Sequence, residues 1–416
     1  MDRYEALPSV VSKKPRFFYG YIIVLVALGI QMVSWGMVNS FGVFFKPLLS
    51  EFGWSRATIS GATSLNILLS GLVGVIAGVL NDRSGRPRMV MTACGLFFGL
   101  GYLLMSQLNT IWQLYLFYGI VVGIGLSATD VVLLSTIARW FVKRRGTMSG
   151  IIKVGAGIGI FIMPLVINKL IFAYDWRNSF IVLGTLALVF ITLIAQLLRR
   201  DPSQKGLLPD GEEAVTGASR DLAKEGLSFL EATHTRQFWE ICAIYLITVF
   251  CALTILTHIT LHAIDIGISA TNAAALLSNI GGASIVGRLV MGNVSDRIGP
   301  KRAMAICFFI LVAVLSWLLL SQELWMLYLF STVYGFTHGG FATLISPMVA
   351  ELFGTRSLGT IFSTVALSGT IGGAIGPFLA GLLFDTQGSY RLAFLICTAL
   401  SIIALVLASL LKQPTR

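Results

Sequence analysis

The sequence predicts an all-α membrane protein whose twelve transmembrane helices form two six-helix pseudo-repeats. Of its 416 residues, 56% are hydrophobic and only 12% are charged, which leaves more apolar surface than a water-soluble globule can bury. Apolar runs of roughly 20 residues, the length that crosses a bilayer as a helix, follow one another along the chain. In addition, a motif of the first half recurs in the second half.

The apolar runs are expected to be helices because each is long and apolar on every side, whereas the strands of a membrane barrel alternate over about 10 residues. The first half is predicted to cross the membrane at 18–45, 57–80, 89–106, 110–138, 147–172 and 178–198. The second half is predicted to cross it at 238–262, 272–295, 303–321, 324–350, 359–384 and 391–411.

A polar stretch at 199–237 separates these two sets of six spans. It contains two prolines and a cluster of acidic residues, which favour turns and solvent-exposed loops. We therefore expect a cytoplasmic linker there, between an N-terminal bundle at 18–198 and a C-terminal bundle at 238–411. Cytoplasmic tails are expected at 1–17 and 412–416.

The basic residues are distributed unevenly about the spans. With the N-terminus in the cytoplasm, the cytoplasmic segments hold most of the 30 Lys and Arg residues. The opposite side holds Lys46, Arg56, Lys169, Arg177 and Arg391. This is the positive-inside rule, so the net charge of +11 indicates topology, and we expect no nucleic-acid partner. Both termini are expected in the cytoplasm.

Short loops and tails predict a multi-pass protein of a bacterial plasma (inner) membrane. No cleavable signal peptide precedes the first span, which is expected to remain in the mature protein. The five cysteines are scattered through apolar spans without ligand spacing, so we expect neither a metal site nor a cofactor.

The repeated motif joins the second and third spans of each half. Gly78–Arg88 recurs as Gly292–Arg302 at an offset of 214 residues, and a second correspondence links the fifth and eleventh spans. Parallel six-helix repeats place a binding cavity near the bilayer midplane between the halves, which rock to alternate access to it.

The sequence Gly-x-x-x-Asp-Arg-x-Gly-Arg in this loop resembles the best-known signature of the major facilitator superfamily, which implies that superfamily's fold. An Asp followed by an Arg at the cytoplasmic end of a helix can pair with a neighbouring helix and hold the inner face shut. The alternative is that these charges only anchor the topology. The residues expected at this cytoplasmic gate are Asp82, Arg83, Arg86, Asp296 and Arg297.

Two further stretches resemble the signatures of the monocarboxylate transporter family. One is Trp140–Gly159, where a basic run leads into a glycine-rich segment, and the other is Tyr19-Gly20-Tyr21, which has tyrosines where the family has tryptophans. The oxalate/formate exchangers share similar features. The resemblance spans essentially all twelve helices and implies a carboxylate transporter.

Arg288 lies in the eighth predicted span, within an otherwise apolar stretch. Burial of a guanidinium costs several kcal/mol unless the group is paired, so it usually faces a cavity or a partner, and its planar fork matches a carboxylate. The repeat places Gly74 at the equivalent position, so the fold does not require an arginine there. The family resemblance implies that Arg288 binds the substrate carboxylate; the alternative is a structural ion pair.

Proton-coupled members of the family carry an Asp four residues before that Arg and a Lys in the first span, where this chain has Ser284 and Asn39. The familiar proton relay therefore cannot be carried over. The other charges deep within spans are Asp130 and Lys153, whose depths on antiparallel helices agree within about 5 Å at ~1.5 Å rise per residue. We hypothesise that they form a pair that either carries the coupling proton or locks the fourth and fifth helices.

Several polar side chains are candidates for the substrate cavity. His338 is flanked by glycines near mid-membrane and is expected to face the cavity. Asn39, Ser284 and Tyr118 are expected to hydrogen-bond a substrate hydroxyl or carboxylate, with ordinary interhelical bonding as the alternative.

A histidine pair, His258 and His262, is expected on one helix face near the outer end of the seventh span. No third ligand of matching depth accompanies the pair, so polar lining or a point of proton access is favoured over a metal site.

These features predict a secondary active transporter of small monocarboxylates such as lactate or pyruvate, without enzymatic activity, working by alternating access and proton symport. One fixed cation suits a monocarboxylate, and the eleventh span has only Val365 and apolar or hydroxyl neighbours where the oxalate exchangers carry a Lys. The alternatives are a carboxylate exchanger of the oxalate/formate type, a uniporter, or a membrane sensor. The expected partners are a small carboxylate anion, protons and membrane lipids, and the expected state is a monomer.

Overall fold

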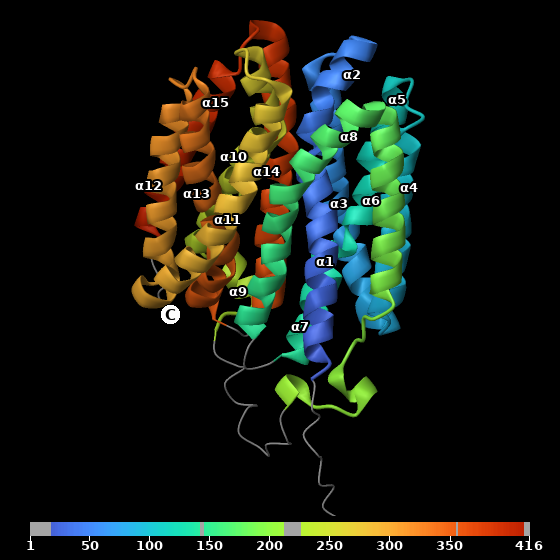
Figure 1. The fold of residues 1–416 in the computed structure, drawn as a ribbon. Helices are drawn as coiled ribbons and strands as arrows, with labels where there is room; N and C mark the ends of the chain where they lie inside the picture. Colours follow the sequence, from blue (N-terminus) through green and yellow to red (C-terminus); the bar gives the residue numbers. More distant parts are fainter. Residues whose placement is uncertain (1–17, 142–144, 212–225, 355–356, 412–416) are drawn as a thin grey trace, which may run out of the picture.

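The computed structural model describes residues 18–141, 145–211, 226–354 and 357–411, which form an almost entirely helical protein (Figure 1). The first half contains α1 (Gly20–Asn39), η1 (Phe41–Phe44), α2 (Phe45–Phe52), α3 (Arg56–Ser84), α4 (Pro87–Met105), α5 (Ile111–Leu114), η2 (Tyr115–Val122), α6 (Gly123–Leu126), α7 (Ala128–Trp140) and α8 (Arg145–Ala195). Between the halves lie η3 (Pro202–Lys205), η4 (Pro209–Gly211) and α9 (Phe229–Thr233). The second half contains α10 (Arg236–Asp265), α11 (Ala270–Ile298), α12 (Pro300–Leu318), α13 (Leu324–Phe353), α14 (Leu358–Gln387) and α15 (Arg391–Leu410).

Ten helical segments of the described chain are long and apolar enough to cross a membrane. α8 counts once among them although it consists of two antiparallel legs. α13, whose sequence is interrupted by glycines and polar residues, lies outside this set and packs against α11 and α12. Each predicted span thus corresponds to a helix, a chain of short helices or a helical leg, and the predicted all-α fold with two six-helix halves is confirmed.

Long helices begin where side chains satisfy their first free N–H groups. Ser55, Thr235 and Ser269 precede α3, α10 and α11, and each accepts a hydrogen bond from the backbone N–H three residues later. Such caps favour helix initiation at these residues. The polar breaks between the apolar runs therefore set the ends of the helices as well as their separation.

The chain reverses direction within α8 at Asp175, which has φ 72° and ψ 174°. Aspartate tolerates a positive φ better than most residues because its short side chain can bond locally, and here it accepts a hydrogen bond from the backbone N–H of Arg177. The leg before Asp175, which we call the first leg, runs beside α1: a Cβ added at Gly155 would meet the backbone of Leu28. The second leg packs against α4 in the same way, at Gly184.

The predicted span at 110–138 is less regular than expected. It consists of α5, η2, α6 and α7, and η2 is a π-helix at Tyr115–Val122. A π-helix is rare and replaces the regular hydrogen bonds of an α-helix with bonds to residues five positions apart. An evenly apolar sequence has no pattern that predicts such a segment.

The halves form two bundles that lie side by side (Figure 1). α1 begins and α15 ends at one face, which we call the terminal face, whereas α2 and the α14–α15 turn lie at the opposite face, which we call the distal face. The bundles meet where α3 packs against α14 and where the first leg of α8 packs against α11. Glycine allows the backbones to approach, since a Cβ added at Gly281 of α11 would collide with Phe161 of α8.

The described parts of the segment between the halves, with η3, η4 and α9, lie at the terminal face (Figure 1), and a bridge between Gly226 and Gly354 connects this segment to the second bundle. Residues 1–17, 212–225 and 412–416 of the expected tails and linker lie outside the described residues. The expected boundaries at 18–198, 199–237 and 238–411 stay a prediction.

Candidate functional site

Arg288 lies on α11 where that helix meets the other bundle. Arg288 is only 6% exposed to solvent. Its Nε and Nη1 atoms have no hydrogen-bond partner among the described residues. The guanidinium is seated against Gly157 on the first leg of α8, because a Cβ added at Gly157 would collide with Nη1.

An unpaired buried guanidinium is energetically unfavourable. Polar groups buried without partners cost about 1–3 kcal/mol each, and more when they are charged. The described protein does not offset this cost at Arg288, whereas a bound anion would. The absent side chain of Gly157 makes room for the guanidinium itself, which places this charge between the two bundles.

Ser284 and His338 accompany Arg288. Ser284 lies one turn earlier on α11 and donates its hydroxyl to the carbonyl of Gly281 at 2.7 Å. α13 packs closely here, since a Cβ added at Gly339 would meet the Ser284 carbonyl. His338 precedes Gly339 on α13 and stacks on Tyr334 with ring centroids 6.2 Å apart.

Asp130 and Lys153 are in direct contact. Lys153 Nζ lies 2.5 Å from Asp130 Oδ1, and the two side chains are 28% and 35% exposed. Gln31 of α1 donates to the same oxygen at 2.6 Å. Because Lys153 precedes Gly157 by four residues, the pair lies on the face of α8 that meets Arg288, about one helical turn nearer the terminal face.

Asn39 and Tyr118 are not brought to Arg288. Asn39 donates to the carbonyl of Trp35 at 2.9 Å, within its own helix. Tyr118 is fully buried and stacks on Phe41 with ring centroids 3.8 Å apart. At ~1.5 Å rise per residue, Asn39 lies about 10 Å closer to the distal face than Met32, which contacts Gly159 of α8. Their expected part in substrate binding therefore has no support from this geometry.

The expected gate residues lie at the terminal face. The side chains of Asp82 and Arg83 are outside the described set. Arg86, Asp296 and Arg297 are exposed, and within the described chain none of the three takes part in an ion pair.

At the distal face the bundles are joined by an arginine that the sequence did not single out. Arg56, at the start of α3, donates from Nη1 and Nη2 to both oxygens of Asp265 at 2.6 and 2.7 Å, and from Nη1 to the Tyr390 hydroxyl at 2.9 Å. Its guanidinium lies 3.6 Å from the ring centroid of Phe384. Asp385 accepts bonds from the first two N–H groups of α3, at 3.0 and 2.7 Å. We call these five residues the distal clamp.

His258 and His262 are next to the distal clamp. His258 is fully buried, with Nδ1 3.0 Å from the Tyr390 hydroxyl and Nε2 2.9 Å from the Pro377 carbonyl. His262 meets Phe394 edge-on, with ring centroids 5.1 Å apart. His258 therefore does not line the space at Arg288. No group of three or more His, Cys, Asp or Glu in the described chain could hold a metal ion.

Gly157, Gln31 and Arg56 are the residues that sequence reasoning missed. Gly157 lies in the glycine-rich segment of the family resemblance, and only the fold shows that its missing side chain makes room for a guanidinium. Gln31 could have been found from the sequence, because it is a polar amide in an otherwise apolar first span. A fully buried amide requires a hydrogen-bond partner, which here is Asp130.

Comparison with known proteins agrees with this architecture. The family model of the Major Facilitator Superfamily matches residues 24–290 and 265–416. Monocarboxylate transporter 12 of Rattus norvegicus is 25% identical over 425 residues, covering 96% of this chain and 86% of the relative. Monocarboxylate transporter 13 of Rattus norvegicus is 27% identical over 390 residues, covering 93% and 88%.

A solved structure has the same fold at low sequence identity. It is a bacterial homolog of the human lysosomal transporter Spinster in an inward-facing and occupied conformation. It matches with a TM-score of 0.76 and 15% identity, and the match covers 95% of this chain and 97% of that one. The family match, the curated relatives and the fold confirm the resemblance read from the sequence, and the chain belongs to the major facilitator superfamily.

Proposed function

We propose that this protein is a secondary active transporter of small monocarboxylates, of the size of lactate or pyruvate, and that Arg288 binds the carboxylate. The observation that carries the proposal is the buried guanidinium between the bundles, whose Nε and Nη1 have no partner among the described residues. A carboxylate satisfies such a group because two parallel N–H···O bonds match its planar fork. The names of the two relatives support the substrate class.

The decisive experiment is uptake into proteoliposomes with an imposed pH gradient, comparing labelled lactate, pyruvate and oxalate. Arg288→Lys keeps the charge but loses the fork, so we expect its kcat/KM for the transported acid to fall roughly 10–100-fold, the effect of about 1.4–2.7 kcal/mol. Arg391→Lys, at an exposed arginine of α15 outside the gate and the site at Arg288, is the matched control. Transport by Arg288→Lys equal to that of the wild type for every acid would contradict the assignment.

We also propose proton symport through the Asp130–Lys153 pair. The pair lies about one turn from Arg288 and is partly exposed, so a proton can reach it and an incoming anion changes its electrostatics. Protonation of Asp130 would release Lys153 toward the substrate, which links proton and anion binding. The same bonds can instead act as a lock between α7 and α8.

An anion exchanger is the second candidate, because Ser284 replaces the acidic neighbour that proton-coupled relatives place before the arginine. Exchange requires no titrating group. Counterflow in vesicles without a pH gradient, combined with absence of pH-driven accumulation, would identify exchange.

The terminal face is proposed to be cytoplasmic, in a plasma membrane, because Arg86, Arg297 and their basic neighbours gather there. Bonds of the distal clamp close the external side, whereas Cβ atoms added at Gly150 of α8 or Gly292 of α11 would meet nothing within 4 Å. This arrangement supports an inward-facing conformation. The Asp82 and Asp296 motifs would then engage neighbouring helices when the cytoplasmic side closes.

A further inference from the structure

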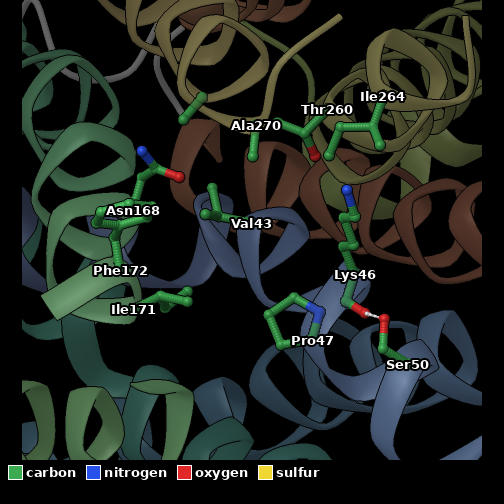
Figure 2. A pocket seen from close by; sticks show the side chains of 11 residues that line it. Val43, Lys46, Pro47, Ser50, Asn168, Ile171, Phe172, Thr260, Ile264 and Ala270 are labelled. Carbon is green, nitrogen blue, oxygen red and sulfur yellow. Dashed lines mark hydrogen bonds between the residues drawn. The ribbon is translucent and has the colours of Figure 1, made fainter. Parts of the chain in front are cut away.

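A cavity of about 420 Å³ lies at the distal face, away from Arg288 (Figure 2). Both bundles contribute to it. Its walls are mostly apolar, with Val43, Pro47, Ile171 and Phe172 from the first bundle and Ile264, Ala270 and Ala274 from the second. The polar residues of the lining are Lys46, Ser50, Asn168 and Thr260.

Lys46 provides the charge of this cavity. Its exposed side chain runs along one side of the cavity toward Thr260 and Ile264, and its backbone carbonyl accepts a hydrogen bond from the Ser50 hydroxyl at 2.9 Å (Figure 2). Within the described chain Lys46 takes part in no ion pair. Two acidic residues adjoin the lining in sequence, and both are already paired: Asp265 accepts two hydrogen bonds from Arg56, and Glu51 forms an ion pair with Arg177 at 2.9 Å.

We propose that this cavity is an external binding site for an amphipathic organic monoanion, such as a medium-chain alkyl carboxylate, whose binding inhibits transport. The apolar walls accept an alkyl chain and Lys46 pairs with one carboxylate. A dianion would find only one cation in the lining, Lys46, so its second charge would have no partner there. The inference rests on the proposed function for its orientation and for the inhibition, while binding itself can be tested without transport.

Inhibition follows from the way in which the cavity is built. Thr260 of α10 donates to the Gly42 carbonyl at 3.1 Å, and Asn168 of α8 donates to Thr271 of α11 at 3.3 Å. Both bonds join the two bundles beside the cavity. The cavity therefore exists in this shape only while the distal ends are together, and an occupant stabilises that conformation over the outward-open one.

The test uses the purified full-length protein in neutral detergent, with octanoate as probe and isothermal titration calorimetry as readout. Lys46→Gln is expected to weaken octanoate binding roughly tenfold, through loss of the charge pair. Ala270→Phe, which fills the cavity without changing charge, is expected to weaken it as well. Lys169→Gln is the matched control, because Lys169 is an exposed lysine next to Asn168 that does not line the cavity.

Two further probes define the chemistry. Octylammonium carries the same chain with the opposite charge, and acetate carries the charge without the chain, so both are expected to bind much more weakly than octanoate. Octanoate affinity that is equal in the wild type, Lys46→Gln and Ala270→Phe would overturn the site. Competition by phosphatidylglycerol would overturn the assignment to a free monoanion and identify a lipid.

The Arg288→Lys variant separates this inference from the proposed function. Octanoate binding should persist in that variant, whereas loss of binding would show that octanoate occupies the central site and would overturn the proposal. In vesicles, external octanoate should inhibit uptake of the transported acid noncompetitively, and Lys46→Gln should relieve this inhibition while transporting normally without octanoate. Competitive inhibition that Lys46→Gln leaves unchanged would overturn the inhibitory role.

Discussion

At the scale of single residues, the central feature is a guanidinium held between two bundles by a helix that offers it space but no counter-charge. Arg288 lies against Gly157, and Lys153, one turn away, is already bonded to Asp130. The local charges are thus balanced except at Arg288. Binding of an anion is therefore favoured, because the anion would offset the desolvation cost of the buried guanidinium.

Gly157→Ala tests the space beside Arg288. The added Cβ would overlap Nη1 and lie 2.9 Å from Ile285 Cγ1, so the flexible guanidinium is expected to move aside rather than the helices to part. We expect KM to rise roughly tenfold, about 1.4 kcal/mol of binding, with little change in Tm. Gly150→Ala on the same helix, where a Cβ meets nothing within 4 Å, is the control. An unchanged KM would show that the substrate binds elsewhere.

Asp130→Asn distinguishes proton coupling from a helix lock. The substitution preserves size and removes the titrating group, so under coupling it abolishes accumulation driven by a pH gradient and spares counterflow. Under the lock, accumulation and counterflow decrease together and Tm falls. Asp201→Asn, at a carboxylate that lies 3.8 Å from Arg139 at the terminal face, is the control. Wild-type accumulation in Asp130→Asn would exclude the coupling role.

At the scale of helices, glycines and helix termini decide which contacts open and which persist. α3 begins against the second bundle, with its first N–H groups bonded to Asp385, and it crosses α14 at Gly71, where a Cβ would meet Thr370. The two copies of the repeated motif lie at the other end of α3 and of α11, where Arg86, just after α3, and Asp296 and Arg297 of α11 are exposed. One helix thus carries the distal clamp at its beginning and the candidate cytoplasmic gate at its end.

Arg56→Gln is expected to weaken the distal clamp and to populate the outward-open conformation. It removes the paired bonds to Asp265 and the ring contact with Phe384, which together are worth about 1–2 kcal/mol when partly exposed. In a cysteine-free background, Ser60→Cys, buried against Gly381, should then react several-fold faster with an external impermeant maleimide. Arg391→Gln serves as the control. Equal rates would show that Arg56 does not hold the external side closed.

At the scale of the whole molecule, two bundles that contact each other over small residues can rock as units. α3–α14 and α8–α11 form this contact, and the described bonds across it gather at the distal face. Because the bundles are internally well packed, closing one face is expected to open the other.

Reciprocal accessibility tests this rocking. The cysteine of Gly292→Cys lies in open space near the terminal face and should react rapidly with maleimide from the cytoplasmic side. Arg56→Gln should slow this reaction and accelerate the reaction of the cysteine in Ser60→Cys. A simultaneous increase at both cysteines would indicate local loosening of the structure instead of alternating access.

The sequence by itself determined the twelve crossings, the repeat and the position of Arg288 within a span. The length of an apolar run and the placement of charges are local properties of the sequence, and they decide which segments enter a bilayer and in which orientation. The pairing of Asp130 with Lys153 could be predicted from the rise per residue of a helix, which places the two side chains at similar depths in the membrane. The tertiary structure alone decided that Asn39 and Tyr118 lie away from Arg288, that Gly157 makes its space, and that Arg56 joins the bundles. Those outcomes depend on helix rotation and on contacts between residues hundreds of positions apart, which a single apolar sequence does not encode locally.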